Sequence, residues 1–210
     1  MIRSEWWGLD QPYEATWRRQ HQRREALIRG EGSPCLALLE HRSVLTVGRR
    51  EAPGTPDRAT LAAHGIDRFK VERGGLATWH GPGQLVGYLI CDVWALGLGA
   101  RSTVCALESG LIGYLGDLGL AAQRREGLIG VWIGEQKIAS VGMHFKRGHS
   151  LHGFSLNLRC DPGVWSLFTP CGLSHQSVVS AHQLLGDAPS PRVAADPVAA
   201  CVLAALGAGG

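Results

Sequence analysis

The sequence predicts an α/β (α+β) fold, in which a mixed sheet is flanked by helices. Short apolar runs with the alternation typical of strands recur along the chain, and stretches of helical periodicity stand near both ends and in the middle. The chain has 210 residues, of which 45% are hydrophobic, enough for one substantial core and too little for two. We therefore expect residues 1–210 to form a single domain.

The first part of the chain predicts a helix followed by two strands. Residues 12–29 place Tyr13 and Trp17 on an apolar face and several arginines on a polar face, which predicts a surface helix. The runs Cys35–Glu40 and Val44–Val47 have β character. Because they follow each other closely, we expect them to pair as a hairpin.

Further strands are expected in the middle of the chain and toward its end, and Lys137 would stand at the start of one of them. These strands are Phe69–Val71, Leu85–Val93, Gly130–Ile133, Lys137–Phe145 and Gly153–Leu158.

Two more helices are expected. Ser102 or Thr103 can cap a helix that runs to about Leu118. Near the C-terminus, Asp196 supplies an N-cap and Pro197 a first-turn proline for a last helix.

Charge and lysine usage narrow the possible functions. A net charge of +3 is too small to indicate nucleic acid as a partner. Of the 21 basic side chains only Lys70, Lys137 and Lys146 are lysines. Because arginine supplies positive charge elsewhere, each lysine raises the question of what a deprotonatable amine provides, with chance as the alternative.

The composition also predicts where the protein resides. No segment approaches the roughly 18 consecutive apolar residues of a membrane-spanning helix, so we expect no membrane association. The N-terminal stretch MIRSEWWGLD lacks the apolar core of a secretory signal. Six cysteines occur without a C-x-x-C pair, which favours reduced thiols. We expect a cytoplasmic protein.

The stretch RGGLATWHGPGQ at 73–84 is dense in glycine. Glycines let the backbone approach a ligand closely and turn its N–H groups toward it, which predicts a binding loop; a plain hairpin between two strands is the alternative. The chain lacks a Gly-Lys pair, so the stretch is not a P-loop. His80 has no second His or Cys at a ligand spacing, and we expect no metal site.

Cys171 is the candidate nucleophile. Most single cysteines in soluble domains are buried small hydrophobes. However, Cys171 lies between Pro170 and Gly172, and a Pro-Cys-Gly turn is suited to expose the sulfur and present N–H groups beside it. Cys105, inside a predicted apolar helix, lacks that setting. Without a G-x-S-x-G elbow or a papain- or caspase-type motif, these residues favour acyl transfer through Cys171.

Four blocks in collinear order resemble the lipoyl (octanoyl) transferase family. They are RGGLATWHGPGQLVGY at 73–88, KIASVGMHF at 137–145, HGFSLNL at 152–158 and PCG at 170–172. The segment LLEHRSVLTVGRR at 38–50 and the helix around Tyr13 extend the resemblance over nearly the whole chain. Ser155 and Trp79 depart from the residues usual in the family, and the tail after about Gly186 matches little.

The resemblance implies a fold like the catalytic domain of biotin and lipoate protein ligases, and one octanoyltransferase catalytic domain over residues 1–210. It implies transfer of an octanoyl (or lipoyl) group without a cofactor, as the first step of endogenous protein lipoylation. The donor would be octanoyl-acyl carrier protein. The acceptor would be a lysine on the lipoyl domains of 2-oxoacid dehydrogenase complexes or on the glycine-cleavage carrier protein.

Carried over by residue, the resemblance makes Cys171 the nucleophile that forms the acyl thioester and Lys137 its partner. The substrate contacts that it implies are Arg73, Gly74, Gly75, Leu76, Ala77, Thr78, Trp79, His80, Ser140, Val141, Gly142, Gly153, Phe154 and Ser155.

Proximity of a thiol and an amine would explain the chemistry. A free thiol has a pKa of about 8.5 and a free lysine one of about 10.4, so neither is in its reactive form at neutral pH. Together and away from water, either an ammonium lowers the thiol pKa or a desolvated amine accepts the thiol proton. The sequence leaves both possibilities open.

Other interpretations remain at this stage. An ATP-dependent lipoate or biotin ligase would share the fold and the protein acceptor, and a non-catalytic acyl-binding protein would share the fold alone. Arginines at 18–29 could steer an acidic carrier domain, or form a plain solvated face. Apolar residues near the blocks could line an acyl tunnel or belong to the core, namely Trp79, Leu85, Val141, Met143 and Phe154.

Overall fold

A computed structural model of the protein describes residues 1–50, 55–167 and 178–207. The predicted nucleophile Cys171 lies outside these residues. The elements in chain order are β1 (Arg3–Gln11), α1 (Tyr13–Ile28), β2 (Cys35–His41), β3 (Val44–Val47), α2 (Arg58–Ala62), β4 (Asp67–Lys70), β5 (Ala77–His80), β6 (Gln84–Ile90), the short 3-10 helix η1 (Trp94–Leu96), α3 (Ala100–Asp117), β7 (Ala122–Arg125), β8 (Leu128–Ile133), β9 (Gln136–Lys146), β10 (His149–Asn157), η2 (Pro162–Leu167), α4 (Ala181–Leu185) and α5 (Pro191–Gly207).

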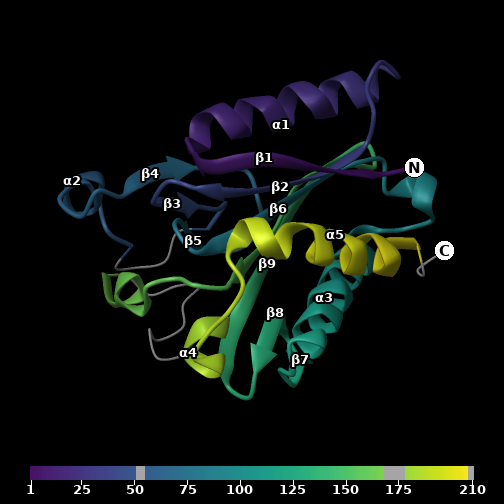
Figure 1. The fold of residues 1–210 in the computed structure, drawn as a ribbon. Coiled ribbons are helices and arrows are strands. Elements are labelled where there is room, and N and C mark those ends of the chain that lie inside the picture. Colours follow the sequence, from purple (N-terminus) through teal and green to yellow (C-terminus); the bar gives the residue numbers. More distant parts are fainter. Residues whose placement is uncertain (51–54, 168–177, 208–210) are drawn as a thin grey trace.

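The strands form two sheets. A seven-stranded mixed sheet has the order β1-β2-β6-β10-β9-β8-β7, and a three-stranded sheet has the order β4-β3-β5. In the larger sheet β1 and β2 are parallel, whereas the other described pairs are antiparallel. Helix α1 runs along one side of this sheet, and α3 and α5 lie on the other side (Figure 1). The predicted α/β architecture with a mixed sheet is confirmed.

The main hydrophobic core lies between the large sheet and the helices α3 and α5. It combines Leu36 and Leu38 of β2 with Leu107 and Leu111 of α3 and with residues of α5. The two helices approach closely at Gly110, where an added Cβ would lie 2.5 Å from the Cα of Val202. This packing fixes α3 and α5 against the face of the sheet opposite α1.

Helix α1 buries a polar stripe, and this was not expected. Its buried residues are Tyr13, Thr16, Gln20 and Arg24, spaced three or four positions apart, so they form one face. Trp17, predicted on the apolar face, is only half-buried. The predicted surface helix is confirmed, but the predicted division of its faces is wrong for Arg24, which is buried because α1 meets polar partners on the sheet.

The hairpin expected between β2 and β3 does not form. Strand β2 is buried along nearly its whole length, and it pairs with β1 on one side and β6 on the other. Strand β3 pairs with β4 and β5 in the small sheet. A strand buried in this way needs neighbours on both edges to satisfy its backbone groups, which leaves β2 no edge for β3.

The ends of two helices also differ from the expectation. Helix α3 begins at Ala100, and Ser102 acts from inside it, with its Oγ accepting the N–H of Gly99 at 2.8 Å. Helix α5 begins at Pro191 and contains Pro197 instead of starting there. Pro197 cannot donate to the Val193 carbonyl, but Val193 is 66% exposed, so water can satisfy that carbonyl.

The sequence reasoning missed strands β1, β5 and β7 and helices α2 and α4. Strand β1 has one buried residue among nine, α2 has only five residues, and β5 occupies the middle of the predicted glycine-rich loop. In the described part of the chain, no helix combines the length and the apolar character required to span a bilayer.

Candidate functional site

A cavity of about 860 Å³ lies against β9 and β10. The loop at 73–76, parts of β5 and β6, the start of α3 and the hairpin between β7 and β8 complete its walls. Of the predicted site residues it brings together Arg73, Gly74, Gly75, Leu76, Thr78, His80, Lys137, Ser140, Val141, Gly142, Gly153, Phe154 and Ser155. Blocks that are far apart in the sequence therefore share one cavity.

Two of the residues predicted to contact substrate, Ala77 and Trp79, are not among the residues that line this cavity. They alternate with Thr78 and His80 along β5, so their side chains point to the opposite face of the strand. There, both belong to a second hydrophobic cluster, and the Trp79 ring meets Trp165 edge-on with centroids 6.0 Å apart. The side chains at these two positions serve packing.

Small residues form part of the cavity lining on the two central strands. Ser140 and Ser155 are direct cross-strand partners, and so are Gly142 and Gly153. The loop packs onto this surface, since a Cβ added at Gly142 would lie 3.2 Å from the Cδ of Arg73. The small side chains at these positions therefore let the loop approach the two strands closely.

Arg73 organises the loop from within. Its guanidinium donates to the carbonyls of Gly74 and Leu76 at 3.0 and 2.8 Å, and to the carbonyl and hydroxyl oxygens of Thr46 at 2.8 and 2.9 Å. Only 7% of the residue is exposed. A buried guanidinium with several acceptors is a strong structural tie. The resemblance implied a substrate contact at Arg73; the structure adds this scaffolding role.

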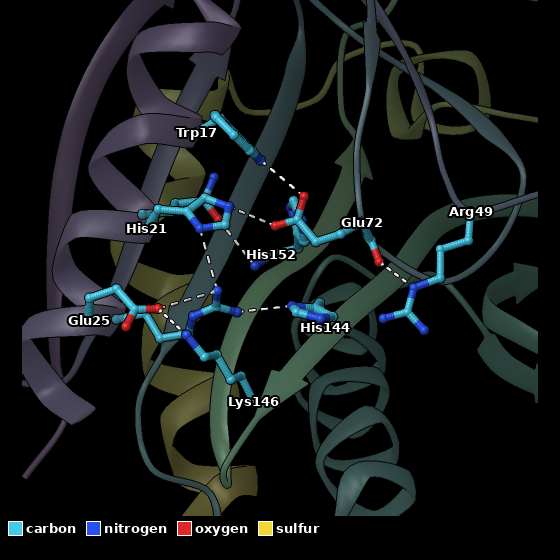
Figure 2. Close-up of polar contacts among 10 residues, drawn as sticks. Trp17, His21, Glu25, Arg49, Glu72, His144, Lys146 and His152 are labelled. Carbon is cyan, nitrogen blue, oxygen red and sulfur yellow. Dashed lines mark hydrogen bonds and ion pairs between the residues drawn. The ribbon is translucent and has the colours of Figure 1, made fainter.

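A second tie comes from Glu72, a residue that the sequence analysis did not single out. One carboxylate oxygen accepts the indole N–H of Trp17 at 3.2 Å, and the other lies 2.7 Å from His21 Nε2 and 3.5 Å from His152 Nε2. Figure 2 shows the three side chains converging on the carboxylate from α1 and β10. Glu72 therefore links the start of the loop to α1 and β10.

Burial alone would raise the pKa of the Glu72 carboxyl. Hydrogen bonding and charge from the His152 imidazole and the bond from Trp17 outweigh this effect, so that the pKa lies well below its usual range. Burial lowers the pKa of His152, although Glu72 opposes that shift. Glu72 thus stays ionised in the folded protein at pH values where a free carboxyl is protonated.

Glu72→Gln is expected to destabilise the protein by about 1–3 kcal/mol at neutral pH, because a charged acceptor of the half-buried donors Trp17 and His21 is lost. A depressed folded-state pKa contributes stability above the unfolded value near 4.3, and that contribution is lost as pH falls through the folded value. The Tm difference between wild type and Glu72→Gln should therefore be largest at neutral pH and shrink below about pH 4.

Glu5→Gln is the matched control for this experiment. Glu5 also accepts an indole N–H, from Trp7 at 3.0 Å, and also contacts a basic side chain, Arg23 at 2.7 Å, but it lies on β1 and is not joined to the loop at 73–76. Both variants should lose stability, and only Glu72→Gln should raise the KM for the acyl donor. Equal KM values would contradict the linkage between Glu72 and the loop.

Lys137 lies in the second position of β9, as predicted, and is 8% exposed. Its Nζ is 5.0 Å from the centre of the Trp132 ring. A Cβ added at Gly130 would lie 2.7 Å from the Cε and 3.3 Å from the Nζ of Lys137. The amine is therefore confined between Trp132 and a position where only glycine leaves it space.

Glu108 supports the strand beside Lys137, and the sequence analysis missed it. The residue is 4% exposed, accepts the Gly130 N–H at 2.7 Å and accepts Arg124 Nε at 3.0 Å. A glutamate inside an apolar stretch of α3 was the signal that could have identified it. Glu108 holds Gly130, and thereby one wall around the lysine.

The chain returns to Lys137 after the segment that contains Cys171. Val178 forms a parallel bridge with Lys137, and the Val179 N–H donates to the Lys137 carbonyl at 3.0 Å. Val178 follows Cys171 by seven positions in the sequence. The covalent chain thus limits how far Cys171 can be from Lys137, to about 25 Å at full extension.

The arginines of α1 are engaged within the chain, which leaves the idea of steering by this helix without support. Arg24 is buried and donates to His144 Nδ1 at 2.9 Å. The ion pairs of the helix and its end are Arg18–Glu14, Arg19–Glu5, Arg23–Glu5, Arg24–Glu25 and Arg29–Glu31. Around the cavity, Arg50 and Arg101 are exposed, and so is Arg124, which pairs with Glu108.

Metal-binding potential is low in residues 1–50, 55–167 and 178–207. No group of three His, Cys, Asp or Glu side chains there is arranged to hold a metal ion. His80 instead places its Nδ1 2.7 Å from Gln84 Oε1, and Gln84 in turn donates to Asn157 Oδ1 at 2.9 Å. Burial lowers its pKa well below the ordinary value, so the imidazole is neutral.

The fold and this cavity define a lipoyl protein ligase A/B catalytic domain, and the model of that family matches residues 12–206. An octanoyltransferase of Mycobacterium marinum is 41% identical over 184 residues, covering 83% of this chain and 76% of its own length. The chain belongs to the octanoyltransferase family.

Solved structures share the fold at low sequence identity. A bipartite lipoate protein ligase from Thermoplasma acidophilum, described with its E2 lipoyl domain, superposes with a TM-score of 0.72 at 19% identity, over all of this chain and 84% of that one. Biotin protein ligase from Aquifex aeolicus gives a TM-score of 0.55 at 11% identity, over 98% and 70% of the two chains. The fold implied by the sequence resemblance is thereby confirmed.

Proposed function

We propose that this octanoyltransferase moves an octanoyl group from acyl carrier protein to a lysine of a lipoyl domain through a thioester on Cys171. The observation that carries the proposal is the convergence of three sequence blocks, with Lys137 among them, on one cavity. Val178 pairs with Lys137, which supports the nearness of the Cys171 segment to the amine. The location in the cytoplasm and the extent of the domain over residues 1–210 are predictions from the sequence.

The first half-reaction is attack of the Cys171 sulfur on the carrier thioester. A new bond joins this sulfur to the acyl carbon, and the bond to the carrier sulfur breaks. The thiol proton moves to the Lys137 amine and from there to the departing carrier thiolate. Residues that exclude water around Lys137, such as Trp132, would strengthen this exchange.

In the second half-reaction the acceptor lysine amine attacks the enzyme thioester. A carbon–nitrogen bond forms, the carbon–sulfur bond breaks, and the Cys171 thiol is restored with a proton from the attacking amine. The donor thioester supplies the driving force, so no nucleotide is needed. The same fold in ATP-dependent ligases acts on a different donor.

Octanoyl transfer without nucleotide tests the function. The purified chain is mixed with octanoyl-acyl carrier protein and an unmodified lipoyl domain, and the acceptor is followed by intact mass. We expect octanoylation of one lysine in the absence of ATP. Modification that requires free octanoate and ATP, and that fails with the carrier thioester, would instead identify a ligase. Binding without turnover would identify an acyl-binding protein.

A further inference from the structure

Four buried rings line the part of the cavity that α1, β5, β6 and β10 form, and they are here called the end wall: Tyr13, His80, Tyr88 and His152. All four line the cavity and none is more than 7% exposed. Tyr13 is parallel to His80 at 6.3 Å between centroids, and Tyr88 meets His152 edge-on at 6.5 Å. By contrast, Leu128 and Ile129 of the β8 region are 42% and 58% exposed where they line the cavity.

The end wall is distant from the amine of the site. Tyr88 pairs with Gly153, and Gly153 pairs with Gly142 of β9. Gly142 lies five residues along β9 from Lys137, which is about 16 Å in a strand. Between them the lining includes the small cross-strand pairs and apolar side chains such as Val141 and Phe154. An acyl chain whose carbonyl lies near Lys137 would point its methyl end toward the wall.

Buried hydrogen bonds hold the wall from behind. His41 is fully buried, its Nε2 lies 2.6 Å from the Tyr88 hydroxyl and its Nδ1 lies 2.9 Å from the Gln11 carbonyl. Its ring also lies 5.2 Å from that of Tyr13. Moving Tyr88 away from the cavity would break a buried hydrogen bond and leave His41 unsatisfied, which is costly.

His152 is held in place as well. Its backbone N–H donates to Gln20 Oε1 at 3.1 Å, and its imidazole faces Glu72, as Figure 2 shows. Its φ angle is +65°, a left-handed conformation that a histidine adopts at a cost and that its surroundings must enforce. The wall therefore cannot recede easily when a longer ligand presses against it.

We propose that the end wall sets the longest acyl chain that the site accepts. The inference rests on the proposed function, because it takes the cavity to hold the acyl group. A chain that reaches the wall fills the space, and each further methylene must displace a close-packed ring whose position is tied by hydrogen bonds. Selectivity for acyl-chain length then depends on the hydrogen bonds that hold the wall. Of the four wall residues, only His80 was among the predicted substrate contacts.

Tyr13→Ala tests the wall, because it removes one of the four rings and leaves in place the hydrogen bonds by which Arg73 and Glu72 hold the loop. Rates of acceptor modification are measured with octanoyl-, decanoyl- and dodecanoyl-acyl carrier protein. The ratio of kcat/KM for dodecanoyl over octanoyl should rise at least about tenfold in the variant, the scale on which a pocket discriminates one or two methylenes. Tyr88→Leu, a second wall variant, should shift the ratio in the same direction.

Tyr114→Ala controls for loss of a buried tyrosine. Tyr114 is as buried as Tyr13, at 4% exposure, and also lies on a helix, but it belongs to the main core and does not line the cavity. The Tyr114→Ala variant should have a lower Tm than the wild type and the same ratio of kcat/KM for dodecanoyl over octanoyl. A wild-type ratio in both folded wall variants would overturn the inference. A wild-type protein that transfers no acyl group from any carrier thioester would overturn the proposed function itself.

Discussion

Cys171→Ala is expected to reduce octanoyl transfer at least about a thousandfold, because removal of a covalent nucleophile leaves only binding and electrostatic assistance. Two measurements report the loss: turnover with octanoyl-acyl carrier protein, and intact mass of the enzyme mixed with the donor alone. The wild-type enzyme should gain one octanoyl group on Cys171, found by peptide mapping. The variant should gain none.

Cys105, a thiol that the structure places in the cavity, provides the control. It is half-buried, it lines the cavity, and its thiol is not the predicted nucleophile. Cys105→Ala should therefore retain the acyl-enzyme and near-normal turnover. An acyl group found on Cys105, or on any site other than Cys171, would contradict the assignment, and so would unimpaired transfer by Cys171→Ala.

The second large effect is expected at Lys137. Loss of a proton-transferring amine in Lys137→Ala should lower kcat by about 10²–10⁴. Lys137→Arg distinguishes the two possible roles, since arginine keeps the charge and cannot take up the thiol proton. A comparable loss in both variants supports proton transfer, whereas near-normal turnover in Lys137→Arg would show that a fixed charge is sufficient. Lys146→Ala, at an exposed lysine paired with Glu25, should behave as wild type.

Gly130→Ala tests the placement of the amine without changing it. The added Cβ would contact the Cε and Nζ of Lys137, so kcat should fall with little change in the KM for the donor. Gly127→Ala is the control, because Gly127 also has a positive φ angle but has no atom within 4 Å of an added Cβ. Both variants bear backbone strain and should lower the Tm. Only Gly130→Ala should also lower kcat.

Much of the site was accessible from the sequence because its residues stand in compact blocks with local patterns. Alternation places β9 and β10, and thus Ser140, Gly142, Gly153 and Ser155, on strands that the reasoning could recognise. The same pattern could have excluded Ala77 and Trp79. Once 77–80 is a strand, only every second side chain can face the cavity, and the analysis had treated this stretch as a loop.

The polar face of α1 was beyond such reasoning. Gln20 and Arg24 are buried because they form hydrogen bonds with His152 and His144. These partners lie more than a hundred positions away in the sequence. A helical pattern reports which residues share a face, and it does not report whether the surface opposite them is apolar or polar. The roles of Glu72 and Glu108 depend in the same way on contacts across elements.

By itself, the sequence determined the class of fold and the family, and it predicted the residues of the reaction, because these follow from local periodicity and from short blocks in order. The tertiary structure decided how the residues act together. It brought Lys137 against Gly130 and Trp132, tied the loop to Thr46 through Arg73 and to α1 through Glu72, and lined the cavity with rings, one of which is held by His41. These features depend on packing between distant segments, and packing distances are set only when the chain is folded.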